Sequence, residues 1–189
     1  MTARLRPRKT RVVVIGPECA GKTTLASELA AEFDAPWTQE AARLYAEATT
    51  EPLSARTVEP IARLSMQLED ALSEESGEPP HLLVRDTDLV STVVYARHYY
   101  GDVPEWIPRE ARARCADLYL LCHPDLPWSP DGVRDRPRQR LELLEAFRQE
   151  LIDMRAPQVV DITGFGESRR LAARSAVERL FDAPNTASS

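Results

Sequence analysis

The segment that most constrains the fold is a glycine-bounded loop between a short apolar run and a helical pattern. Residues 16–23 read Gly-Pro-Glu-Cys-Ala-Gly-Lys-Thr and match G-x-x-x-x-G-K-[ST], the P-loop pattern. The β-branched run at 11–15 predicts a buried parallel strand, and Leu25, Leu29, Ala30 and Phe33 then recur at helical spacing. The order of strand, loop and helix predicts an α/β fold with this loop at the carboxyl end of a strand.

The loop is suited to binding phosphate, because its backbone N–H groups and the following helix N-terminus point at one place. Lys22 would hold the β- and γ-phosphates of ATP, and Thr23 would offer its hydroxyl to Mg²⁺. Lys22 is one of only two lysines among 24 basic residues, and a compact ammonium fits between phosphate oxygens better than a guanidinium. The alternative is a chance match in an ordinary strand-turn-helix. The predicted ATP-binding residues are Gly16, Pro17, Glu18, Cys19, Ala20, Gly21, Lys22, Thr23 and Thr24.

Size and charge narrow the class of protein. A chain of 189 residues suits one domain, and no apolar run approaches the roughly twenty residues that span a bilayer. We therefore expect a cytoplasmic protein with no membrane partner. The three cysteines form no CxxC pair, so neither a zinc site nor a disulfide framework is predicted. A net charge of −6 opposes binding to nucleic acid and favours a small nucleotide held by a local cluster.

Strand and helix patterns alternate along the rest of the chain. Further apolar runs at 34–37, 81–85, 117–122 and 158–162 predict strands, the first of them weak. Helical spacing follows at 39–45, from 58 to Gly77, from 89, at 141–151 and at 166–181. The alternation predicts a three-layer α/β domain over residues 11–181, with a flexible arm at 1–10 and a disordered tail at 182–189.

Two carboxylates follow the strand predicted at 81–85. Asp86 stands where a carboxylate reaches Mg²⁺ or accepts a proton from an attacking hydroxyl. Asp88 would share that work and contact the substrate, or else cap the helix that begins at Leu89. Arg85 interrupts the apolar strand, and we expect it to face a covering helix.

A proline- and glycine-rich segment at 124–136 leads into four closely spaced arginines and predicts a mobile, arginine-rich lid. We expect Arg134 and Arg136 to be catalytic, because an arginine brought onto the transferring phosphoryl group is worth about 10³ to 10⁵ in rate. For Arg138 and Arg140 the alternative is a solvated helix face that pairs with nearby glutamates.

Candidate acceptor-binding residues lie in two further places. Glu40 and Arg43 are three residues apart, which places them on one helix face as a sugar-binding pair or as an intrahelical ion pair. Trp128 stands between prolines and offers a flat face to an acceptor base, and Asp131 follows it in the lid. Most of the tyrosines, at positions 45, 95, 99 and 100, are expected to be packing residues.

Together these segments resemble the ribosylnicotinamide kinase family, the kinase half of NadR-type proteins. The matching stretches are Gly16-Pro17-Glu18 with Gly21-Lys22-Thr23-Thr24, Glu40-x-x-Arg43, Asp86-Thr87-Asp88, Tyr99-x-Gly101, and Pro124-Asp125-Leu126-Pro127-Trp128 with Asp131-Gly132-x-Arg134. The resemblance implies a P-loop kinase fold with a five-stranded, mainly parallel sheet. It also implies ATP- and Mg²⁺-dependent phosphorylation of nicotinamide riboside to nicotinamide mononucleotide.

The resemblance assigns roles to matching positions. Lys22 and Thr23 would serve ATP·Mg²⁺, Asp86 the acceptor hydroxyl or the metal, Arg134 the lid, and Trp128 would lie near the nicotinamide ring. Only about ten residues precede the first strand, so dinucleotide synthesis is expected to fall to another protein. The alternatives are a P-loop kinase for another nucleoside and a nucleotide-dependent regulatory ATPase or switch. A kinase of nucleic-acid ends is opposed by the acidic charge balance.

Overall fold

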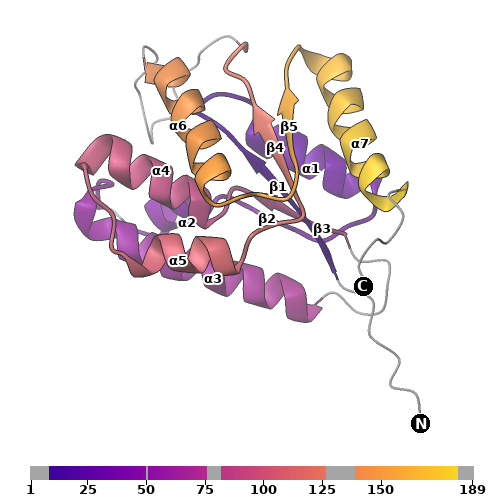
Figure 1. Cartoon of the computed structure of the whole chain (residues 1–189). Coiled ribbons are helices and arrows are strands. Elements are labelled where there is room, and N and C mark those ends of the chain that lie inside the picture. The colour runs from indigo at the N-terminus through magenta and orange to yellow at the C-terminus, as the bar shows by residue number, and fades with distance from the viewer. Residues whose placement is uncertain (1–8, 50, 76–81, 127–138, 183–189) are drawn as a thin grey trace.

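The computed structural model of the protein describes residues 9–49, 51–75, 82–126 and 139–182, which form a parallel sheet covered by helices on both faces (Figure 1). The strand order is β2-β3-β1-β4-β5, and every paired neighbour is parallel. The strands are β1 (Thr10–Ile15), β2 (Trp37–Thr38), β3 (Leu82–Asp86), β4 (Leu118–Cys122) and β5 (Val159–Ile162). The predicted three-layer α/β fold with a five-stranded parallel sheet is therefore confirmed.

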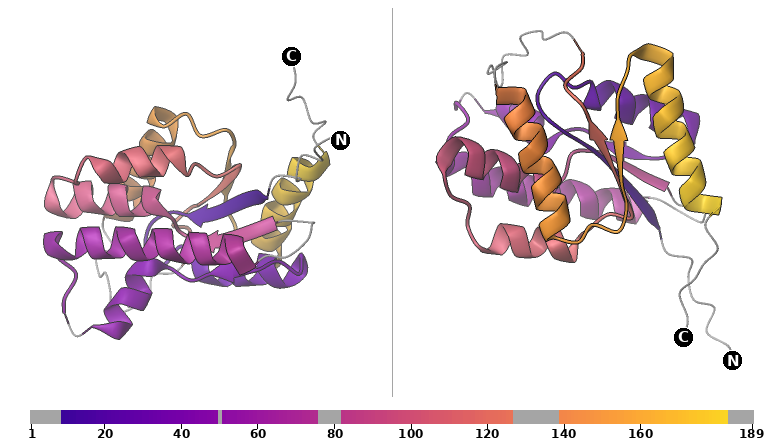
Figure 2. Two further views of the ribbon diagram at one scale, coloured as in Figure 1. Left: turned by 90° about the horizontal axis from the view of Figure 1, so that it is seen from below. Right: turned by 45° about the horizontal axis from the view of Figure 1, so that its top comes forward.

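Helices α3 to α6 cover one face of the sheet, and α1 and α7 cover the other (Figures 1 and 2). Helix α2 packs against α3. The helices are α1 (Lys22–Glu32), α2 (Ala41–Ala48), α3 (Val58–Glu75), α4 (Leu89–Tyr100), α5 (Trp106–Ala113), α6 (Arg140–Asp153) and α7 (Gly166–Asp182), and a 3-10 turn at Ala55–Thr57 precedes α3. Among the described helices, none has the length and apolar character needed to cross a membrane.

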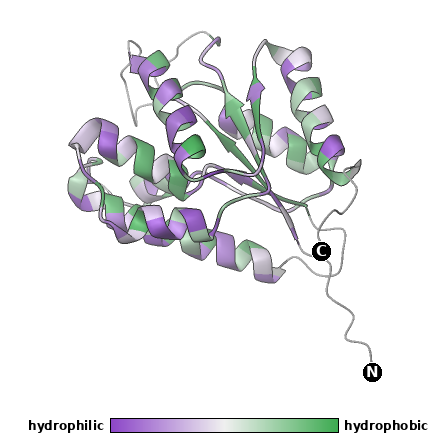
Figure 3. Cartoon of the chain, in the orientation of Figure 1, coloured by the Kyte–Doolittle hydropathy of each residue, from purple (hydrophilic) through white to green (hydrophobic). Residues whose placement is uncertain are grey.

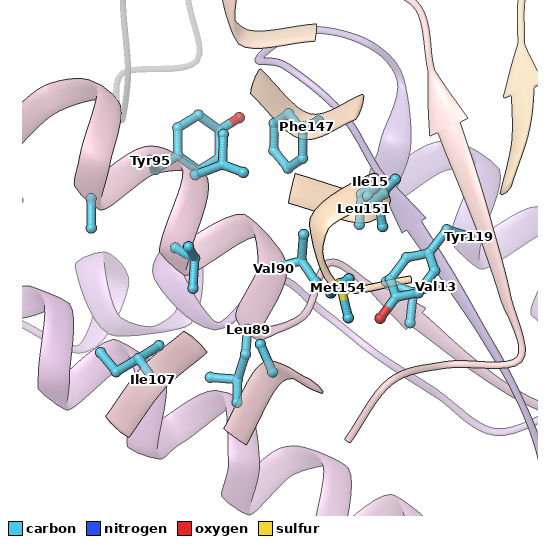
Figure 4. Packing of buried hydrophobic residues seen from close by; sticks show 14 of the residues in the cluster. Val13, Ile15, Leu89, Val90, Tyr95, Ile107, Tyr119, Phe147, Leu151 and Met154 are labelled. Carbon is cyan, nitrogen blue, oxygen red and sulfur yellow. The ribbon is translucent and has the colours of Figure 1, made fainter. Parts of the chain in front are cut away.

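Alternate residues of the central strand supply the two halves of the core. Val12 and Val14 of β1 pack toward α1 and α7, whereas Val13 and Ile15 pack toward α4 and α6. Because both faces are covered, the inner strands contain apolar runs at residues 12–15 of β1, 82–84 of β3 and Leu118–Cys122 of β4, which account for most of the green in the centre of the sheet in Figure 3. Figure 4 shows the second half, where the rings of Tyr95 and Phe147 meet edge to face at 5.6 Å.

Three local predictions need correction. Strand β2 starts at Trp37 and has two residues, so most of the run predicted at 34–37 is loop. Helix α5 was not predicted: it has eight residues, with Pro108 tolerated in its first turn, and only Ile107 and Ala111 are buried. Leu141, the first residue of the stripe predicted at 141–151, is 70% exposed, because α6 turns Leu143 inward instead.

The predicted division into arm, single domain and tail stays a prediction, and only the outermost elements can be compared with its limits. Strand β1 begins at Thr10 and α7 ends at Asp182, one residue beyond each predicted limit.

Candidate active site

The P-loop joins β1 to α1 and depends on two glycines. Gly16 has φ 141°, and a Cβ there would lie 2.5 Å from the Cys122 carbonyl oxygen. Gly21 has φ 71°, and a Cβ there would lie 2.7 Å from Leu126 Cδ1. Neither position accepts a larger residue without distortion. Among the described side chains none caps the start of α1, so its first N–H groups suit an anion.

Lys22 lies over this loop. Its side chain is 8% exposed, and Nζ donates a hydrogen bond of 2.8 Å to the Pro17 carbonyl oxygen. An ammonium has three donors on a flexible stem, so it can exchange this bond for phosphate oxygens without moving the loop. The structure thus places Lys22 where the sequence predicted it.

Asp86 lies beside the P-loop because β3 pairs with β1, with Val14 opposite Asp86. The Thr23 hydroxyl donates a short hydrogen bond to Asp86 Oδ2. Asp86 Oδ1 is buried and accepts no hydrogen bond within the described part of the chain. Two predicted metal-site residues are therefore in contact, and their hard oxygen donors are of the kind that Mg²⁺ prefers.

The environment of Asp86 favours its protonated form. Burial raises the pKa of Asp86 to about 6, and the negative charge of Glu40 adds to the rise. The cations Lys22 and Arg43 and the hydrogen bond from the Thr23 hydroxyl oppose it. A carboxylate with a pKa near 6 is ionised at neutral pH and basic enough to accept a proton during reaction.

Glu40 and Arg43 both act on Asp86, so the structure brings this predicted pair to the site. Glu40 is the N-cap of α2 and Arg43 lies in its first turn, so the helix begins two residues later than the predicted start at residue 39. The Arg43 N–H donates to the Glu40 carbonyl oxygen at 3.1 Å. The predicted sugar-binding role of both residues stays a prediction.

Asp88 has the capping role that was its alternative. Its Oδ1 accepts a 2.9 Å hydrogen bond from the Val90 N–H at the start of α4, and its Oδ2 accepts one of 3.0 Å from the Tyr119 hydroxyl. Burial raises the pKa of Asp88, and the nearby Arg85 guanidinium opposes that rise. Substrate contact by Asp88 stays a prediction. Arg85 itself faces α3, as expected, and pairs with Glu69 at 2.9 Å.

A cleft opens next to Asp86 between α2, α3 and α4. Its walls include Glu40, Asp88, Tyr95, Tyr99 and Tyr100. The Tyr95 hydroxyl donates to the Gly16 carbonyl oxygen at 3.2 Å, and the Tyr99 hydroxyl donates to Glu18 Oε1. Two tyrosines expected to be packing residues therefore also connect the cleft to the P-loop.

Two arginines that bind the P-loop backbone were missed. Arg140 is 8% exposed, and its Nη2 donates to the Cys19 and Leu126 carbonyl oxygens at 3.2 Å each. The solvated helix face that was its alternative is thus wrong for Arg140. Arg169 is 5% exposed, and its Nη2 donates to the Ala20 carbonyl oxygen at 2.6 Å.

Arg169 also connects the P-loop to neighbouring segments. It pairs with Asp125 Oδ1 at 2.9 Å and donates to the Gly164 and His123 carbonyl oxygens at 3.2 and 3.3 Å. The sequence contains no signal for this role, because Arg170 beside it has the same residue type and pairs instead with Glu32 and Glu167.

Comparison with known proteins shows the family to which this chain belongs. The matching family model is described as an AAA domain and covers residues 11–169. The chain belongs to this AAA domain family. No curated protein sequence matches it.

Several solved structures have folds similar to the fold of this chain. The NadR protein in complex with NR is 24% identical, with a TM-score of 0.76 over 93% of this chain and 52% of that one. The NadR protein in complex with NAD and AMP-PNP is 23% identical, with a TM-score of 0.74 over 96% and 52%. Thymidylate kinase from Ehrlichia chaffeensis is 11% identical, with a TM-score of 0.62 over 91% and 100%. The chain thus spans about half the length of the NadR chains, and the likeness confirms the predicted P-loop kinase fold.

The residues of the predicted lid lie outside the part of the chain that the structure describes, and their roles stay predictions. These residues are Trp128, Asp131, Arg134, Arg136 and Arg138. Both ends of the segment are described, and the Arg140 guanidinium joins them by donating to the Leu126 carbonyl oxygen. The two described residues that flank the segment most closely in these contacts, Leu126 and Arg140, therefore lie beside the P-loop.

Proposed function

We propose that the protein transfers the γ-phosphoryl group of ATP to nicotinamide riboside and releases nicotinamide mononucleotide. The observation that carries the proposal is the position of Asp86, which touches Thr23 on the P-loop side and adjoins Thr87 and Asp88 of the cleft on the other. A nucleotide in the P-loop and an acceptor in the cleft would thus meet at one carboxylate. The likeness to the NadR complex with NR, nicotinamide riboside, supports the choice of acceptor.

The charge of the cleft supports a nucleoside rather than a nucleotide as acceptor. The described residues that line it include two carboxylates, Glu40 and Asp88, and three tyrosines, but no lysine, arginine or histidine. An acceptor phosphate would need positive charge to replace its hydration, as Arg–phosphate pairs provide elsewhere. The pyridinium ring of nicotinamide riboside carries a fixed positive charge, which carboxylates and aromatic faces stabilise.

A second hollow beside the P-loop suits the nucleoside part of ATP. It is lined by Gly21 and Thr24 of the P-loop region, by Leu126, and by Gly166 and Arg169 at the start of α7. Because this hollow shares none of its described lining residues with the acceptor cleft, donor and acceptor would approach Asp86 from different directions. This arrangement supports a reaction between two bound substrates.

Each residue then has a chemical task. The P-loop N–H groups and Lys22 bind the phosphates, and the Thr23 hydroxyl and Asp86 carboxylate would hold Mg²⁺, which offsets charge on the γ-phosphoryl group. Asp86 orients the acceptor's 5′-hydroxyl and accepts its proton. The hydroxyl oxygen forms a bond to the γ-phosphorus as the bond to the β,γ-bridging oxygen breaks, and ADP leaves. Arg134 and Arg136 are predicted to close over the transferred group.

The test is acceptor-dependent ATP consumption. We would incubate the purified protein with Mg·ATP and nicotinamide riboside, adenosine, thymidine or uridine, and identify phosphorylated products by mass spectrometry. We expect nicotinamide mononucleotide to form and ADP release to depend on the acceptor. Phosphorylation of thymidine or uridine alone would reject the acceptor and keep the kinase class. ATP hydrolysis at one rate with and without every acceptor would instead indicate a regulatory ATPase.

A further inference from the structure

Glu18 is a carboxylate inside the phosphate-binding loop, where its charge would repel the phosphates of ATP. It is 4% exposed, so it is not a solvated surface group. Burying a carboxylate costs free energy unless its oxygens find hydrogen-bond donors. A buried acidic residue at this place therefore indicates a task other than holding the triphosphate.

The contacts of Glu18 lead toward the acceptor cleft. Glu18 Oε1 accepts a hydrogen bond from the Tyr99 hydroxyl, and Tyr99 lines the cleft. The Tyr99 ring stacks on Tyr95, with centroids 5.9 Å apart and planes 13° apart, and the Tyr95 hydroxyl is bonded to the Gly16 carbonyl oxygen. Glu18 itself is not among the described lining residues, so it lies behind Tyr99, next to the wall of the cleft that meets the P-loop.

One oxygen of the Glu18 carboxylate lacks a hydrogen-bond donor among the described residues. Glu18 Oε2 is buried and accepts no hydrogen bond from any residue in the described ranges. A carboxylate oxygen only accepts, so the missing partner must be a hydroxyl or an N–H group. Such an orphan in a native structure indicates a ligand group that completes it.

We propose that Glu18 Oε2 accepts a hydrogen bond from a ribose hydroxyl of the acceptor, with Tyr99 holding the carboxylate in place. The inference rests on the proposed function. The 5′-hydroxyl must reach Asp86 and the P-loop, so the sugar lies at this end of the cleft and the base lies farther from the loop. The 2′- and 3′-hydroxyls are then the donors nearest to Glu18. Glu18 becomes an acceptor-binding residue instead of part of the predicted ATP cradle.

The test measures discrimination between the acceptor and its 2′-deoxy and 3′-deoxy analogues. We expect the wild-type protein to prefer the ribonucleoside over at least one analogue by about 10²-fold in kcat/KM, because a buried acceptor left unpaired penalises the analogue. In Glu18→Ala the ratio should fall to within about threefold of unity, with Glu18→Gln intermediate. Tyr99→Phe should lower the ratio only in part, since it removes the support and keeps the carboxylate.

Glu47→Ala, which removes an exposed glutamate of α2, is the matched control and should keep the wild-type ratio. A purely structural role for Glu18 would lower activity on all acceptors equally, so an unchanged ratio in active Glu18→Ala or Glu18→Gln protein would overturn the inference alone. If the wild-type protein prefers another ribonucleoside, the same ratio is measured with that acceptor and its deoxy analogues. ATP turnover that is independent of every nucleoside would overturn the proposed function and this inference together.

Discussion

The two ends of the candidate active site differ in charge. At the P-loop end, Lys22, Arg140 and Arg169 surround a loop of backbone N–H groups. At the cleft end, the described lining residues carry carboxylates and tyrosine rings and no cationic side chain. Apart from Arg43 of α2, which acts on Asp86 without lining the cleft, the described cations near the site lie on the side that would hold the triphosphate, and an acceptor without phosphate fits the other side.

Asp86 stands at the border between these ends. Lys22 and the Thr23 hydroxyl act on it from the P-loop, and Glu40 and, more weakly, Arg43 act on it from the start of α2. A carboxylate placed between a cationic and an anionic region can orient an acceptor hydroxyl toward a phosphate without binding the phosphate itself. The contrast between the two ends is therefore tested most directly at this residue.

The largest effect is expected from Asp86→Asn. An amide keeps the shape of the side chain but cannot take the hydroxyl proton and is a poorer ligand for Mg²⁺, so kcat should fall by about 10³- to 10⁴-fold. Initial-rate kinetics with saturating Mg·ATP and acceptor measure this loss. Asp70→Asn is the matched control, because Asp70 is an exposed carboxylate of α3 that pairs with Arg114. A loss below about tenfold in Asp86→Asn would exclude Asp86 as the base.

The second effect is a dependence of activity on pH. With a pKa of about 6, Asp86 is protonated in acid and then cannot accept the acceptor's proton. We expect kcat/KM for the acceptor to fall about tenfold per pH unit below pH 6 and to level off above it. A profile without an inflection between about pH 5 and 7 would contradict the assignment.

The same pKa has a consequence for stability. Because the folded protein binds the Asp86 proton more tightly than the unfolded chain does, the free energy of unfolding falls as pH rises from about 4 to about 6. The loss contributed by this group approaches about 3 kcal/mol above pH 6, from about 1.4 kcal/mol per pKa unit. Asp86→Asn lacks this titration, so its stability relative to wild type should rise over that range in urea unfolding.

The third prediction concerns the P-loop end alone. Arg169→Lys replaces a planar group that reaches Ala20, Asp125 and Gly164 with an ammonium that cannot reach all three. We expect KM for ATP to rise about tenfold and KM for the acceptor to change less than about twofold. Arg174→Lys is the control, because Arg174 of α7 pairs with Glu32 and Glu178 and is not among the described lining residues of the ATP hollow. Equal rises in both KM values would mean that the two ends are not independent.

The P-loop end could be predicted from the sequence because its signals are local. One run of eight residues contains the glycines, the lysine and the threonine. The flanking strand is marked by a continuous β-branched run and the flanking helix by a 3.6-residue period. Asp86 could also be placed, since the carboxyl ends of parallel strands meet at one edge of the sheet. These contacts follow from chain order alone.

The remaining parts of the site depend on contacts across the fold. Arg169 binds Ala20, which is 149 residues away, and Tyr99 binds Glu18 across 81 residues. Neither contact could be predicted from the spacing of residues in the sequence, because many other arginines and glutamates of this chain are surface residues. Leu141 and Arg140 show the same limit: the stripe was recognised, but which side of α6 faces inward is decided by packing against α4.

The smallest effect is expected from Tyr119→Phe, which tests whether Asp88 belongs to the cleft chemistry or to the framework. The Tyr119 hydroxyl donates to Asp88 Oδ2 and accepts from the Ala116 N–H, and both groups are buried. Removal of the hydroxyl leaves a buried carboxylate oxygen of Asp88 and the Ala116 N–H group without that partner, so the free energy of unfolding should fall by about 1 to 3 kcal/mol.

If Asp88 acts only as the cap of α4, KM for the acceptor should change less than about twofold, because the hydrogen bond from the Val90 N–H keeps the carboxylate in place. Urea unfolding and acceptor kinetics on one sample separate the cases. A rise in KM of more than about fivefold without loss of stability would mean that Asp88 binds the acceptor and that the acidic end of the site extends to it.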